Sequence, residues 1–99
     1  MYVILTSKPG QYRTEVTAGL RPVEAYDYLA QGRLKAHFVI AELSGTPRVR
    51  VVDETEPPVV NEVPSKFLPK YESVEQARRE LRGLTSFGSV QARLDPVAA

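Results

Sequence analysis

Cysteine is absent from the 99-residue chain, and so are several motifs typical of enzymes. Without a thiol the chain cannot form disulfides, cysteine-ligated iron–sulfur clusters, thiolate zinc sites or a thiol nucleophile. Phosphate-binding glycine loops and the G-x-S-x-G serine motif are also missing. We therefore expect no metal, no cofactor and no recognisable catalytic motif, while enzymatic activity as such stays open.

The chain also lacks long apolar runs and a large excess of either charge. No run approaches the ~20 residues of a membrane-spanning helix, and the N-terminus lacks the basic segment and cleavage site of a signal peptide. We therefore expect a cytoplasmic protein without a membrane partner. Thirteen basic and twelve acidic residues give a net charge of +1, which argues against a nucleic-acid partner. The 42% apolar content is typical of one globular domain, expected over residues 1–99.

The hydrophobic pattern predicts five strands and two helices. Segment 36–43 carries largely apolar residues on both of its faces, so we expect it to form a central strand. Pro22 and Gly32 bracket a predicted helix over 22–31, and Ser73 with Gln76 forms a capping box for a second helix. Strands are expected over 2–7, 12–17, 36–43, 48–52 and 89–94, with 12–17 paired to 2–7 and a hairpin joining 36–43 to 48–52.

This order of elements predicts an α+β fold. It matches the βαββαβ order of a ferredoxin-like split βαβ sandwich, with 12–17 as part of an extra N-terminal hairpin arm. In that architecture an antiparallel sheet is covered by two helices. The last residues, 95–99, are expected to form a disordered tail.

Residues 53–72 form a long proline-rich connection that fits neither helix nor strand. Its first half is acidic and stiffened by Pro57 and Pro58, and is expected to be solvated. Its second half, 63–71, carries large apolar residues whose burial is worth roughly 1.5–3 kcal/mol each. We expect this half either to cover the chain's own sheet or to dock on another molecule. The candidate partner-binding residues are Lys66, Phe67, Leu68 and Tyr71.

Two classes of function follow from these observations. The first is a small non-catalytic binding or accessory module that acts through protein–protein contacts, either with a partner protein or by self-association. The alternative is a small-ligand-binding protein or a cofactor-independent enzyme with a pocket between sheet and helices. Its polar groups would be His37, Tyr26 and Tyr28, and its ligand a small organic acid or an aromatic compound. His37 is the only histidine, so a mechanism that needs an imidazole base must use it.

Overall fold

A computed structural model describes residues 1–85 and 92–99 of the chain as a mostly-sheet α+β structure. Its strands are β1 (Tyr2–Ser7), β2 (Tyr12–Glu15), β3 (Leu20–Ala30), β4 (Arg33–Leu43), β5 (Arg48–Asp53), β6 (Val59–Pro64) and β7 (Ala92–Val97). The described helices are the 3-10 turn η1 (Ser65–Phe67) and the α-helix α1 (Val74–Thr85). No described helix has the length and apolar character needed to cross a membrane.

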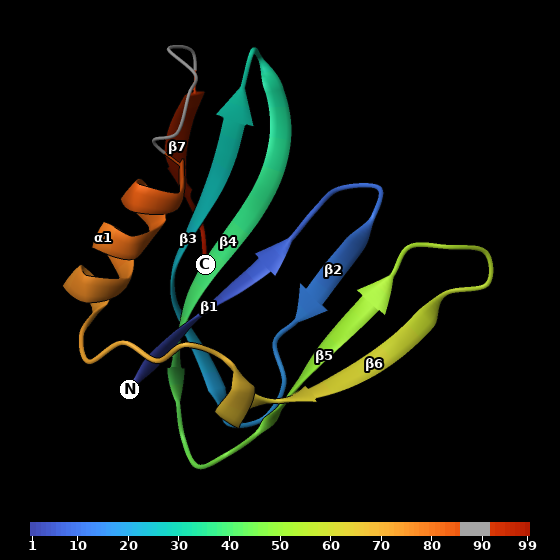
Figure 1. Ribbon diagram of the computed structural model, residues 1–99, viewed down its shortest axis with the longest axis vertical. Helices are drawn as coiled ribbons and strands as arrows, with labels where there is room; N and C mark the ends of the chain where they lie inside the picture. Colours follow the sequence, from blue (N-terminus) through green and yellow to red (C-terminus); the bar gives the residue numbers. More distant parts are fainter. Residues whose placement is uncertain (86–91) are drawn as a thin grey trace.

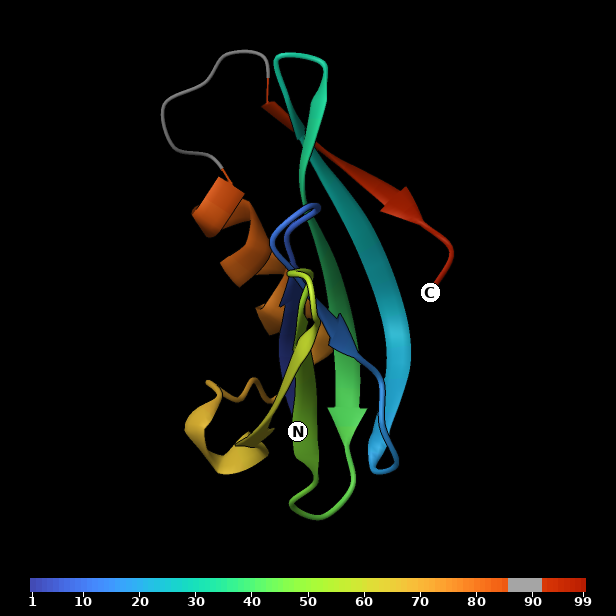
Figure 2. The ribbon, with the colours of Figure 1, turned by 90° about the vertical axis from the view of Figure 1, so that its right-hand side faces the viewer.

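The strands form two antiparallel sheets. One has the order β1-β4-β3-β7 and the other the order β2-β5-β6. Figure 1 shows α1 beside the long β3–β4 hairpin, and the three-stranded sheet beyond β1. The view in Figure 2, a quarter turn away, shows that α1 lies on one side of the four-stranded sheet only. The four-stranded sheet is thus the middle layer of the molecule.

The alternation along β4 explains how this middle layer is packed. Phe38 and Ile40 point to one face and join the apolar cluster that contains Leu81 of α1. Ala41 points to the other face and joins the cluster that contains Val49 of β5. Because β4 pairs with β1 on one side and β3 on the other, the prediction of a central strand with two apolar faces is confirmed.

The prediction of a helix over residues 22–31 is wrong, and the ferredoxin-like sandwich with two helices fails with it. This segment lies in β3, which pairs with β4 and with β7. Gln31 and Gly32 both have positive φ angles, 54° and 73°, as a two-residue hairpin turn of type I′ requires. Gly32 therefore lies in the turn of a β-hairpin and does not end a helix. The hairpin pairing with β4 and the long-range pairing with β7 outweigh the weak helical spacing of the side chains.

The predicted hairpin between 36–43 and 48–52 is also wrong. Both strands exist, but β5 pairs with β2 and β6 in the other sheet. The reason is that both edges of β4 are already occupied by β1 and β3. The predicted pairing of 12–17 with 2–7 does not form a ladder either, because β2 pairs with β5 in the other sheet although β1 is an edge strand. Strands β1 and β2 share only the bridge between Lys8 and Tyr12 and hydrogen bonds from Thr14 to Ser7 and Thr6.

The connection 53–72 has more regular structure than the sequence suggests, since β6 and η1 lie within it. The prolines at 57 and 58 fall in the loop between β5 and β6. The expected tail is likewise ordered in part, because β7 continues to Val97. The strand predicted over 89–94 agrees with β7 from Ala92 onward, while 89–91 lie outside the described residues.

The predicted start of α1 is confirmed. The Gln76 backbone N–H donates to the Ser73 hydroxyl oxygen at 3.1 Å, as in a capping box. The Gln76 side-chain oxygen accepts from the N–H of Glu72 at 2.6 Å, one residue before the expected partner. The cap fixes where the helix begins, and the apolar pair Ala77 and Leu81, both fully buried, fixes which side faces the sheet.

Candidate functional site

The four predicted partner-binding residues do not form a single surface. Leu68 packs against the apolar cluster between the two sheets, and Tyr71 against the cluster beneath α1. Tyr71 also exchanges two backbone hydrogen bonds of 2.8 Å with Tyr2, and burial raises the pKa of its phenol. Phe67, in contrast, is 70% exposed, and the Lys66 ammonium lies 5.2 Å from the centroid of its ring. Leu68 and Tyr71 therefore hold the segment on the chain, while Lys66 and Phe67 face solvent.

The turn that carries Phe67 is held firmly by backbone contacts. The N–H of Ser65 donates to the carbonyl oxygen of Pro47 at 3.0 Å. The Lys70 ammonium donates to the carbonyl oxygens of Ser65 and Leu68 at 3.0 and 3.2 Å. Ser65 itself is buried, and its hydroxyl has no hydrogen-bond partner among the described residues. Phe67 is thus presented to solvent from a fixed loop.

The alternative set, His37, Tyr26 and Tyr28, is divided between the two faces of the four-stranded sheet. His37 Nδ1 lies 2.8 Å from Asp27 Oδ1 across the β3–β4 pairing. Tyr26 and Tyr28 pack beneath α1, on the other face, because residues two apart on a strand share a face. The three side chains therefore cannot act on one small molecule together.

Tyr26 belongs to a polar contact that fastens α1 to β3. Its hydroxyl donates to Glu24 Oε1 at 2.6 Å, and Arg78 Nε of α1 donates to the same oxygen at 2.7 Å. The hydrogen bonds from Arg78 lower the pKa of Glu24 from 4.5 to about 2, and they outweigh the opposite effect of burial. Burial and the bond to Glu24 in turn raise the pKa of Tyr26. Next to this contact, a cavity of about 250 Å³ opens between α1 and β7.

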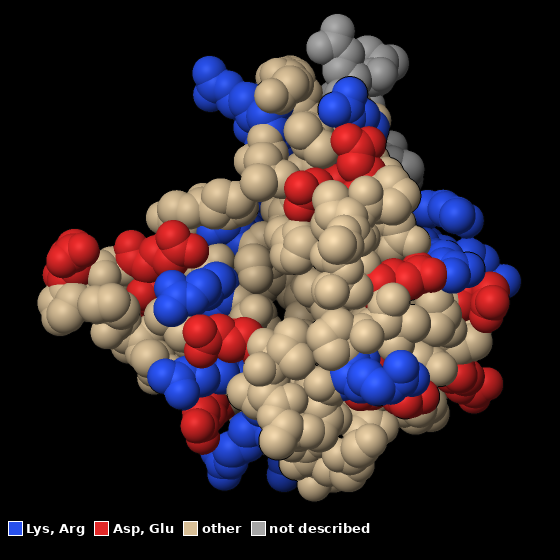
Figure 3. All heavy atoms as spheres, turned by 180° about the vertical axis from the view of Figure 1, so that it is seen from behind, with Lys and Arg blue, Asp and Glu red and all other residues tan. Residues whose placement is uncertain are grey.

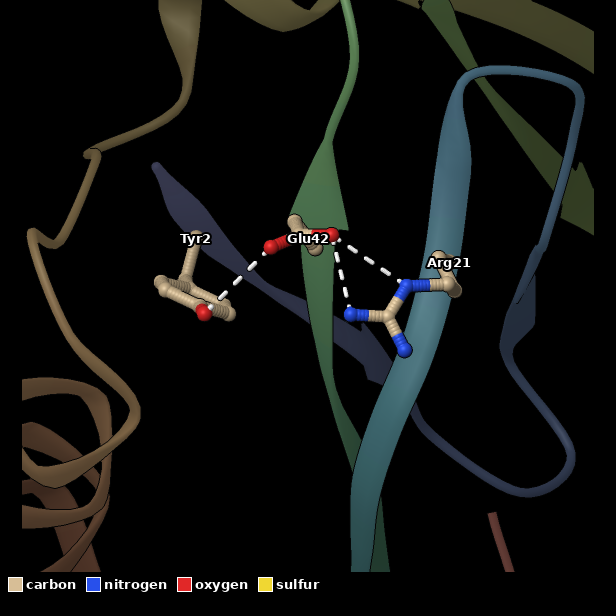
Figure 4. Close-up of polar contacts among 3 residues, drawn as sticks. All are labelled: Tyr2, Arg21 and Glu42. Atoms are coloured by element: carbon tan, nitrogen blue, oxygen red, sulfur yellow. Dashed lines mark hydrogen bonds and ion pairs between the residues drawn. The ribbon is translucent and has the colours of Figure 1, made fainter.

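A second polar contact lies on three neighbouring strands near the ends of β1 and β4 (Figure 4). Glu42 of β4 accepts from Arg21 of β3 at 2.9 and 3.2 Å, and from the Tyr2 hydroxyl of β1 at 3.4 Å. The Arg21 guanidinium lowers the pKa of Glu42. The contact joins the three strands in one row and leaves the carboxylate accessible to solvent.

A further cavity lies beyond the C-terminal end of α1. It measures about 540 Å³, within the range of pockets that hold small molecules. Figure 1 shows that β3 and β4 extend past the end of α1, and residues of all three elements line the cavity. Its lining residues come from β1 and the following turn (Thr6, Lys8, Gln11), from β3 and β4 (Tyr28, Lys35, Ala36, Phe38) and from the end of α1 (Leu84, Thr85).

The lining of this cavity combines an apolar floor with basic and hydroxyl groups. Phe38 and Ala36 are buried floor residues, whereas Leu84 at the end of the helix is 56% exposed. Lys8 and Lys35 are among the lining residues, and none of the described lining residues is acidic. The arrangement favours a molecule with an apolar body and a negative charge.

Sequence reasoning found Tyr28 but missed most of this cavity. The available signal was Leu84, which continues the apolar stripe of Ala77 and Leu81 by three residues. Leu84 is 56% exposed, unlike the buried Ala77 and Leu81, and it lines the cavity. Lys8 and Gln11 carried no signal, because they reach the cavity only through the turn after β1.

The described residues contain no group of three or more histidine, aspartate or glutamate side chains arranged to hold a metal ion. The acidic residues of 53–62 therefore do not form such a group either. No family model, curated protein or solved structure matches the chain.

Proposed function

We propose that the chain is a small-ligand-binding protein whose ligand, a small organic acid with an aromatic or otherwise apolar body, occupies the cavity at the end of α1. The observation that carries this proposal is the combination of an apolar cavity of about 540 Å³ with two lysines and no carboxylate among the described residues that line it. The apolar body would cover Leu84 and the floor made by Phe38.

Polar groups at the cavity supply orientation. An ammonium group of Lys8 or Lys35 would form a charge-assisted hydrogen bond with a carboxylate, which is roughly twice as strong as a neutral one. The hydroxyls of Tyr28 and Thr6 add donors for other oxygen atoms of the ligand. His37 and Tyr26 lie elsewhere, so the geometry supports binding in preference to acid–base catalysis.

A titration with two matched probes tests the proposal. We expect 2-naphthoate to bind saturably, followed by its fluorescence, and the neutral alcohol 2-naphthylmethanol to bind about tenfold more weakly. Replacing both lysines, Lys8→Met with Lys35→Met, should remove the preference for the acid because it removes the charge and keeps most of the side-chain volume. The matched control is Lys66→Met, whose lysine lies on η1 outside the cavity. Equal, non-saturable response to both probes would contradict the proposal.

Apolar contact with the cavity wall is tested separately. Leu84→Ala should weaken binding of both probes about fivefold, since the loss of a contact worth ~1 kcal/mol changes a dissociation constant by that factor. Val16→Ala removes an apolar side chain that is 46% exposed and lies outside the cavity, and it should leave both affinities unchanged.

One observation supports the other candidate function, a module that acts through protein–protein contacts. Phe67 is 70% exposed on a turn held by hydrogen bonds, and exposed aromatic side chains of this kind are enriched in the cores of protein interfaces. If Phe67 lies in such an interface, Phe67→Ala weakens association without lowering thermal stability. An unchanged association constant would exclude this role for Phe67.

A further inference from the structure

Strand β6 offers an unpaired edge at the outside of the three-stranded sheet. It pairs with β5 on one side, and no described strand pairs with the other side. The N–H of Ser65 donates to the carbonyl oxygen of Pro47, so these two residues form a hydrogen-bonded pair. The neighbouring pair in the β5–β6 ladder is Arg48 with Pro64. Bonding alternates along an antiparallel ladder, so Val60 and Glu62 direct their N–H and C=O groups away from β5. These backbone groups are free to accept another strand.

The two ends of β6 carry opposite charges. The loop before β6 contains Glu54 and Glu56, and Figure 3 shows acidic side chains at the outer end of the arm formed by β5 and β6. The turn after β6 contains Lys66, which is exposed and has no ion pair among the described residues. An antiparallel copy of the same strand would therefore meet opposite charge at both of its ends.

We propose that a second copy of this chain pairs with β6 in antiparallel orientation about a two-fold axis. A register centred on Asn61 lets Val60 of each copy exchange both backbone hydrogen bonds with Glu62 of the other, since both direct these groups outward. The same register brings the loop that carries Glu56 and the turn that carries Lys66 of the other copy to the same end of the strand pair. The two-fold axis repeats both contacts, so one surface is complementary to itself.

The structure favours a second copy over another peptide strand because a single register allows both the backbone hydrogen bonds and the contacts between opposite charges. A register shifted so that Val60 faces Val60 of the other copy would bring Glu62 opposite the proline at 58 and would separate Glu56 from Lys66. In the proposed register the side chains of Val59 and Val60, 49% and 45% exposed, each gain a cross-strand neighbour, Val63 and Glu62 of the other copy. The strand is short and the ion pairs lie at its rim, so the dimer is expected to dissociate on dilution and at high salt.

Charge reversal gives a decisive test of orientation and register. Variant one carries Glu54→Lys and Glu56→Lys, and variant two carries Lys66→Glu. Each variant alone should be monomeric by native mass measurement, because each would place like charges at both ends of the strand pair. Their equimolar mixture should restore the dimer as a heterodimer, in which each acidic group again meets a lysine. The unaltered chain should be dimeric at the same concentration.

A backbone variant tests the strand pairing itself. Val60→Pro removes an N–H that points away from β5, so it should abolish the dimer while the far-ultraviolet circular dichroism and the melting temperature of the monomer stay close to those of the unaltered chain. A monomeric unaltered chain, a dimer that survives in either charge-reversal variant alone, or a mixture that stays monomeric would each overturn the proposal. The inference does not rest on the cavity, and the naphthoate titration on the same samples keeps the two results separate.

Discussion

The contact between Glu24 and Arg78 should make the stability of the fold depend on pH in a defined way. Glu24→Gln removes the charge and keeps the shape of the side chain, so the hydrogen bonds of Arg78 and Tyr26 lose their ionic partner. The lowering of the Glu24 pKa from 4.5 to about 2 corresponds to about 3 kcal/mol of stability before solvent screening is taken into account. The two side chains are 23% and 34% exposed, so solvent screens the pair, and we expect a loss of about 2 kcal/mol at neutral pH.

The sign of the pH dependence follows from the lowered pKa. The carboxylate form is favoured in the folded chain, so its contribution is complete above about pH 4.5 and is lost as the pH falls toward about 2. The free energy of unfolding of the unaltered chain should therefore exceed that of Glu24→Gln by about 2 kcal/mol at pH 7, and the difference should shrink through that acidic range.

Urea unfolding of both proteins over a series of pH values measures this difference directly. At neutral pH the change corresponds to a fall of about 10 °C in melting temperature for a chain of this size. Glu80→Gln, an exposed glutamate on the same helix, is the matched control and should shift the free energy by less than about 0.5 kcal/mol. The reasoning is refuted if the two variants have equal stability, or if the loss in Glu24→Gln is the same at pH 3 as at pH 7.

Two further pairs of substitutions test the packing. Phe67→Ala should change the free energy of unfolding by less than about 0.5 kcal/mol because its ring is exposed, whereas Leu68→Ala should cost about 2 kcal/mol because it packs between the sheets. Equal losses in chemical unfolding would show that the turn is arranged differently. Gly19→Ala should cost more than about 2 kcal/mol, since φ is +89° and the new Cβ would lie 2.9 Å from Pro47 Cβ. Gly10→Ala, at φ +77° with open space around it, should cost only about 1 kcal/mol, and a cost as large as that of Gly19→Ala would contradict the close approach.

Local signals in the sequence predicted the elements that local interactions define. The bounds of β1 follow from a β-branched run closed by a turn, and α1 begins at the cap formed by Ser73. Largely apolar residues at both sets of alternating positions identified β4 as a strand buried on both faces. These features need no knowledge of what packs against them, which is why they could be read from the chain alone.

The topology could not be predicted because it depends on competition for strand edges. The pair Pro22 and Gly32 fits a helix with a left-handed end as well as a strand followed by a two-residue turn. Only the presence of β4 and β7 as partners decides for the strand. Similarly, the turn at Gly45 fits a hairpin, but β4 has no free edge left for β5.

The candidate site was even less accessible to sequence reasoning. The cavity brings together Thr6, Tyr28, Phe38 and Leu84 from four separate elements, and only Tyr28 and Phe38 belong to one hairpin. Tyr28 was singled out as a polar group for a pocket, yet its expected neighbour His37 lies on the other face of the sheet. In the partner-binding segment, the composition indicated that apolar residues must be covered, but not that Leu68 and Tyr71 are covered by the chain itself.

The central claim, a small-ligand site at the end of α1, is tested most directly by mapping where the acid probe binds. Backbone amide spectra of the isotope-labelled chain, recorded during titration with 2-naphthoate, report every residue at once. We predict saturable shifts, described by one dissociation constant, that concentrate at Tyr28, Phe38 and Leu84 around the cavity. Shifts that stay linear in probe concentration, or that concentrate elsewhere on the chain, would contradict the account.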